Sequence, residues 1–124
     1  MKLIKKFSLV VMLFVAVLSL VACAPKDPTS AKEKLEDAGY AVSVDGTIQP
    51  NLMKLAGIEG VKSVVIATNG EESVYAVYFE SKGAAKDAMS TLTEWAENNG
   101  KTSNFKRSGQ WLYSGTEQGL KDFK

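Results

Sequence analysis

Apolar and polar positions follow three different patterns along the chain, and each pattern predicts a different kind of segment. The 16 residues from Phe7 to Ala22 carry no charge and form one apolar run. After residue 29, apolar residues recur every three to four positions in some segments, as on one face of an α-helix. In others they recur at every second position, as in a half-buried strand. We therefore expect an apolar N-terminal segment followed by a folded part that mixes helices and strands.

Helical periodicity is accompanied by start and stop signals at three places. Ser30 and Glu33 have the spacing of a capping box, and Gly39 can end that helix in the left-handed conformation. The longest helical pattern is followed by Gly100 as a stop signal, and Thr116 is placed to cap the last helix. The predicted helices cover residues 30–38 and 82–98, and a last helix, capped by Thr116, contains Leu120 and Phe123. Residues 49–60 predict either a short helix or an ordered loop.

Strand patterns alternate with the helical ones. Two runs rich in Val, Ile and Tyr flank Asn69 and Gly70, which are typical of a β-hairpin turn. A second hairpin is predicted around Ser108 and Gly109. The strand after the first turn is apolar on both faces, so we expect it at the centre of a sheet. The predicted strands cover residues 40–44, 61–68 and 73–79 and the two arms of the hairpin over 104–115.

Tight turns between consecutive strands imply antiparallel pairing, and the helices must cover a face of the resulting sheet. The sequence therefore predicts a single small α+β domain in which an antiparallel sheet of about five strands packs with helices. The expected order of elements is α-β-(short α)-β-β-α-β-β-α.

The N-terminal segment has the parts of an export signal. Three lysines, Lys2, Lys5 and Lys6, precede the apolar run, and 16 residues are fewer than the roughly 20 that a membrane-spanning helix needs. The run ends in Leu20, Val21, Ala22 and Cys23, which resemble the lipobox of bacterial lipoproteins. The resemblance implies that the Cys23 thiol receives a diacylglyceryl group and that a signal peptidase cleaves between Ala22 and Cys23.

Two other interpretations of this segment stay open. In one, Cys23 is a buried cysteine within an uncleaved membrane helix. In the other, the general signal peptidase cuts after Ala22 or Ala24, which would leave the cysteine without a purpose.

The lipoprotein resemblance sets the domain boundaries and the localisation that we expect. Residues 1–22 would be the signal peptide, residues 23–29 the lipidated cysteine and a tether, and residues 30–124 the compact α+β domain. Because two or three acyl chains hold a small domain durably at a membrane, we expect the protein at the extracytoplasmic face of the cell membrane. The domain itself resembles small uncharacterised lipoproteins of Gram-positive bacteria.

Composition narrows the classes of function. Removal of residues 1–22 takes away three lysines and no acids, and leaves 102 residues with 12 basic and 14 acidic side chains. This balance argues against a nucleic-acid partner and against membrane binding through a polybasic surface. The chain has no histidine, and Cys23 is its one cysteine. These absences exclude Ser-His-Asp and Cys-His nucleophiles and zinc sites built from Cys and His. We predict no catalytic residue, no metal site and no cofactor.

Aromatic residues give the best sequence signal for a binding surface. Trp111 and Tyr113 point to the same side of one strand, beside Phe105 and Arg107, and this combination is typical of binding hot spots. We name these four residues as the candidate interaction surface, with the alternative that Trp111 and Tyr113 belong to the core. Two other aromatic residues, Phe79 and Trp95, are expected in the core.

The sequence thus predicts a monomeric, non-catalytic binding module, held at the membrane through Cys23, that engages an envelope component or a protein partner. Two alternatives are a carboxylate- or metal-dependent hydrolase of envelope material and an accessory subunit of a transporter. Clustered acids in a concave pocket would favour the hydrolase.

Overall fold

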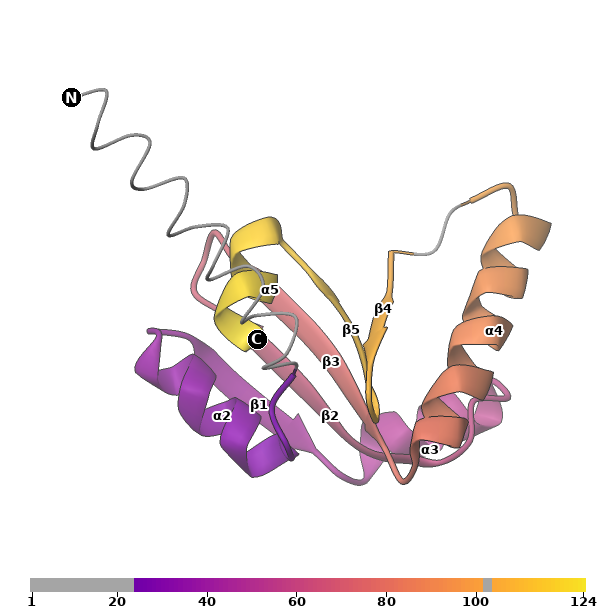
Figure 1. The fold of residues 1–124 in the computed structure, drawn as a ribbon, viewed down its shortest axis with the longest axis horizontal. Coiled ribbons are helices and arrows are strands. Elements are labelled where there is room, and N and C mark those ends of the chain that lie inside the picture. The colour runs from indigo at the N-terminus through magenta and orange to yellow at the C-terminus, as the bar shows by residue number, and fades with distance from the viewer. Residues whose placement is uncertain (1–23, 102–103) are drawn as a thin grey trace, which may run out of the picture.

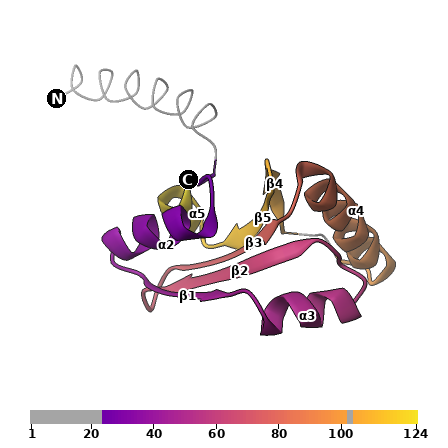
Figure 2. The same cartoon turned by 90° about the horizontal axis from the view of Figure 1, so that it is seen from below.

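The computed structural model describes residues 24–101 and 104–124, which form one α+β domain (Figure 1). A twisted sheet of five strands runs through the middle (Figure 2), and two helices pack against each of its faces. The predicted fold class is confirmed, including the order of elements. These are α2 (Pro28–Asp37), β1 (Ala41–Asp45), α3 (Ile48–Leu55), β2 (Val61–Thr68), β3 (Ser73–Phe79), α4 (Lys82–Asn98), β4 (Lys106–Ser108), β5 (Trp111–Gly115) and α5 (Glu117–Phe123).

The strands lie in the order β1-β2-β3-β5-β4, and every neighbouring pair is antiparallel. β3 is therefore the central strand, as its apolar pattern predicts. Its side chains alternate between two covered faces, which we name the α2/α5 face and the α3/α4 face after the helices that pack on them. Asn69 closes the β2–β3 turn by accepting hydrogen bonds from the backbone N–H groups of Glu71 and Glu72.

The α2/α5 face carries the larger aromatic cluster. Trp111 packs edge-on against Phe123 of α5 with ring centroids 5.2 Å apart, and Tyr113 lies 5.3 Å from the same ring. Leu35 brings α2 onto this cluster and is fully buried. Because small domains have few large side chains, these rings supply much of the core.

The α3/α4 face holds a second core, in which Phe79 is fully buried as predicted. Ala85 and Ala88 let α4 lie close to Leu112 of β5. The prediction that Trp95 joins this core is wrong, since 59% of its surface is exposed. The buried side of α4 includes Ala96, the next residue along the helix, so Trp95 lies on the outer side of α4.

Side-chain caps set where the helices begin. The Thr116 side chain accepts from the Gly119 N–H, so the predicted cap of α5 is confirmed. The predicted Ser30 cap is wrong. Asp27 caps α2 instead, accepting from the Ser30 N–H at 2.7 Å, and Pro28 occupies the first helical position, where its missing N–H costs nothing.

Tyr40 ties the start of β1 to α5, because its hydroxyl donates to Asp122 Oδ2 at 2.7 Å. Burial raises the pKa of Tyr40 to about 12 from an ordinary 10.0, with the Asp122 carboxylate adding to the shift. A raised pKa in the folded state favours the neutral phenol. Its stabilisation is therefore complete below about pH 10 and is lost as the pH rises through 12.

We expect a Tyr40→Phe variant to lose less stability than the wild type between pH 10 and 12. Urea denaturation at several pH values measures this, and subtracting one protein from the other removes the titration of the lysines, which both share. Parallel curves across this interval would contradict the buried Tyr40–Asp122 hydrogen bond.

Candidate interaction surfaces

Trp111 and Tyr113 do not form an exposed surface. Only 2% and 3% of their surfaces are accessible, because α2 and α5 cover the face of β5 to which both side chains point. The alternative that these residues belong to the core is confirmed, and their assignment to the interaction surface is corrected.

The other two residues of the predicted surface lie on the opposite face of the sheet. Arg107 is directly paired with Leu112 in the β4–β5 ladder, so its side chain shares the α3/α4 face with Leu112. Phe105 packs edge-on against Tyr75 on the same face, at 6.2 Å between ring centroids. The four predicted residues are therefore split between the two faces and do not form one surface.

Residues 24–27 are bound to the domain. The Trp111 indole Nε1 donates to the Pro25 carbonyl oxygen at 2.6 Å, and the Tyr78 hydroxyl donates to the Lys26 carbonyl oxygen at 3.2 Å. Ala24 packs against the aromatic cluster. The prediction that the folded domain begins only at Ser30 is therefore wrong, because residues 24–27 contact the domain and are not a free tether.

Ala22 and Cys23 lie outside the described residues. The described chain begins at Ala24 on the α2/α5 face, beside the C-terminal end of α5, as both views show (Figure 1, Figure 2). Lys34 of α2 donates a hydrogen bond to the main-chain oxygen of Lys124 and so holds the residue after α5 against α2. Burial lowers the pKa of the Lys34 ammonium at this contact.

Several exposed apolar side chains lie on the other side of the sheet. Ile48, Leu52 and Leu55 follow one another along the outer side of α3, and 66%, 54% and 85% of their surfaces are exposed. Ile66 of β2, on the face that α3 covers, is 38% exposed. We name Ile48, Leu52 and Leu55 the α3 stripe. Exposed apolar patches of this kind mark sites of association.

The inner side of α3 contacts the sheet, although none of the residues of this helix is fully buried. The Asp45 carboxylate accepts from the N–H groups of Thr47, Ile48 and Gln49 at 2.8 to 3.0 Å. These bonds, the one from Thr47 most of all, lower the pKa of Asp45. Met53 packs into the second core, and Gln49 accepts from the Tyr75 hydroxyl at 3.4 Å.

The sequence contains the spacing of the α3 stripe, because positions 48, 52 and 55 fall on one side of a helix. The usual interpretation of such spacing is a buried face. The orientation of α3, with these residues outward, depends on Met53 and Gln49 contacting the sheet, and local sequence does not reveal those contacts.

Carboxylates gather at one shallow hollow of about 480 Å³ between the loop before β2 and the first turns of α4. Glu59, Glu80 and Asp87 line it. Within residues 24–101 and 104–124, no group of three or more His, Cys, Asp or Glu side chains is arranged to hold a metal ion.

Comparison of the chain with models of known families, with curated proteins and with solved structures finds no match. In the described part of the chain, no helix is both long and apolar enough to cross a membrane.

Proposed function

We propose that this protein is a lipid-anchored binding module at the extracytoplasmic face of the cell membrane, and that it binds a protein partner through the α3 stripe. The N-terminal lysines, the apolar run and the residues up to Cys23 support the anchor. The exposed side of α3 supports the binding surface.

One observation carries the proposal: the start of the described chain and α3, the helix that carries the α3 stripe, lie on opposite sides of the sheet (Figure 2). An anchor at Cys23 would attach next to Ala24, on the α2/α5 face. The α3 stripe would then point away from the bilayer, where a partner protein can reach it.

The chemistry of α3 favours an apolar partner surface. Its eight residues include one charge, Lys54, and burial of each exposed Leu or Ile side chain contributes about 1.5–3 kcal/mol. An interface centred on three such residues is small and suits a specific contact in which they act as anchors.

The anchor is tested by a Cys23→Ser variant. We expect wild-type protein to incorporate a fatty-acid probe and to be processed, while the variant stays unlabelled and uncleaved, because a thioether bond to the lipid requires sulfur. Gel fluorescence and intact mass measure both effects. Equal labelling of the two proteins would overturn the anchor.

The binding surface is tested by a photo-crosslinking residue placed at Leu52 or, as the matched control, at the exposed Lys86 of α4. We expect a discrete crosslinked product on intact cells from position 52 only, and its loss in an Ile48→Gln/Leu55→Gln background. Those substitutions are on the surface and should change the free energy of unfolding by less than about 1 kcal/mol. The same product from both positions would contradict the proposal, as would a product that proves to be a dimer of this chain.

A further inference from the structure

A second hollow lies on the α2/α5 side of the molecule, between the beginning of β4, the edge of β5 and the outer surface of α5. Its volume is about 560 Å³. Three ammonium groups line it, from Lys106, Lys121 and Lys124, together with the carboxylate of Glu117 and the apolar side chain of Leu120.

The charges in this hollow are unbalanced. Glu117 pairs with Lys121 at 3.9 Å in an exposed contact, which screens one ammonium group weakly. Among the described residues, no Asp or Glu lies within 4 Å of the Lys106 or Lys124 ammonium group. The Lys124 ammonium instead lies over the Tyr113 ring, 5.4 Å from its centroid. The hollow therefore presents excess positive charge above a partly apolar floor.

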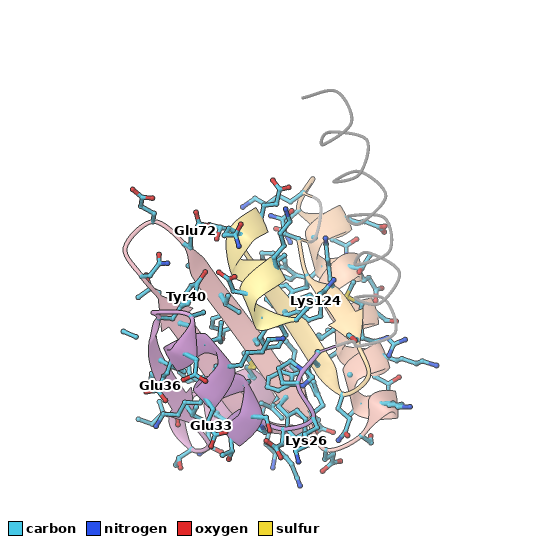
Figure 3. The ribbon with its side chains drawn as sticks, turned by 60° about the vertical axis from the view of Figure 1, so that its left-hand side comes forward. Lys26, Glu33, Glu36, Tyr40, Glu72 and Lys124 are labelled. Atoms are coloured by element: carbon cyan, nitrogen blue, oxygen red, sulfur yellow. The ribbon has the colours of Figure 1, made fainter. Side chains whose placement is uncertain are left out.

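The hollow is close to the start of the described chain. Trp111, which binds the Pro25 carbonyl, and Tyr113, which lies under Lys124, are two residues apart on the same side of β5. That separation is about 7 Å along a strand. Lys26 and Lys124 both appear on the side of the molecule that α2 and α5 occupy (Figure 3).

We propose that this hollow binds the phosphate of an anionic membrane-lipid headgroup. Three lysines suit a phosphate because ammonium groups near an anionic leaflet are attracted to it, and Leu120 offers apolar contact beside the charge. The inference rests on the proposed anchor in one respect, since lipid on Cys23 would bring the hollow to the headgroups. Because Trp111 and Tyr78 bind residues 25 and 26, no flexible linker would separate the lipid anchor from the domain.

The test uses the full chain as cells process it, mixed with lipid nanodiscs that contain either zwitterionic phosphatidylcholine alone or added phosphatidylglycerol. Hydrogen exchange is followed for residues 117–124 and, as an internal reference, for α3. We expect exchange of residues 117–124 to slow by about threefold or more in the anionic discs relative to the zwitterionic ones, while α3 is unchanged.

Two triple variants each remove three positive charges. In Lys106→Gln/Lys121→Gln/Lys124→Gln we expect the slowing to disappear. In the matched control Lys54→Gln/Lys62→Gln/Lys86→Gln, whose exposed lysines lie elsewhere on the domain, we expect it to remain. Loss of slowing in both variants would show attraction by net charge alone and would overturn the proposal.

Further outcomes separate the possible ligands and the two proposals. No slowing in anionic discs would overturn the headgroup site, and equal slowing by inorganic phosphate added to zwitterionic discs would assign the hollow to free phosphate instead. Intact mass of the same sample reads lipidation of Cys23 directly. A chain without lipid whose residues 117–124 still slow would refute the anchor and retain the headgroup site.

Discussion

A Trp111→Ala substitution is expected to lower the free energy of unfolding by about 3–5 kcal/mol, because the ring it removes is almost fully buried between α5 and the sheet. The loss also leaves the Pro25 carbonyl without its donor. The total free energy of unfolding of a small domain is only about 5–15 kcal/mol, so this variant should be close to unfolding at room temperature. Urea denaturation of the domain, followed by circular dichroism, measures the change.

The chain provides a matched control in its other tryptophan. Trp95 is 59% exposed, so Trp95→Ala should change the free energy of unfolding by about 0.5 kcal/mol or less. A third variant, Trp111→Phe, keeps an aromatic ring but removes the N–H, and should cost less than Ala while speeding hydrogen exchange at Ser30 and Ala31, whose N–H groups donate to Asp27 at the end of this segment. Equal effects of Trp95→Ala and Trp111→Ala would contradict the described core.

Local signals in the sequence are sufficient to predict most elements of the fold. The turn at Asn69, the cap at Thr116 and the helix over residues 82–98 each depend on residues within a few positions of one another, and each is found as predicted. The central place of β3 follows from a short-range pattern as well, since a strand that is apolar on both faces must be covered on both.

The proposed binding surface could not be predicted in the same way, because it depends on which side of each element is covered. Alternation puts Trp111 and Tyr113 on one face of β5 but does not say that α2 and α5 pack there. The contact between Trp111 and Pro25 joins residues 86 positions apart, and no local sequence pattern predicts it. The same limitation applies to α3, whose regularly spaced apolar side chains face outward instead of toward the sheet.

Two of these unpredicted features belong to one arrangement. Trp111 contributes to the core and also binds the segment next to Cys23, so the side chain that we expected to meet a partner instead fixes where the chain enters the domain. With the entry point fixed on the α2/α5 face, the proposed anchor and the proposed partner surface on α3 are held on opposite sides of the sheet.

The position of α5, which forms one wall of the lysine-lined hollow, depends on two glycines that meet the backbone of β3. A Cβ atom on Gly115 or Gly119 would overlap the carbonyl oxygen of Ser73, and one on Gly119 would also come within 2.8 Å of Thr116 Oγ1. The Ser73 carbonyl already accepts from the Thr116 N–H at 3.0 Å, so it cannot move aside without breaking this bond.

We therefore expect Gly119→Ala to destabilise the domain by about 1–3 kcal/mol, although alanine is the better helix former by about 1 kcal/mol. The control is Gly83→Ala in α4, where the added Cβ would meet nothing closer than Ser81 Oγ at 3.8 Å. That change should stabilise the domain by about 0.4–1 kcal/mol, because alanine reduces the entropy of the unfolded chain. The two substitutions are chemically identical, so opposite signs in urea denaturation isolate the close approach of α5 to β3. A neutral or stabilising Gly119→Ala would mean that α5 packs less closely than described, and the lysine-lined hollow beside it would lose its wall.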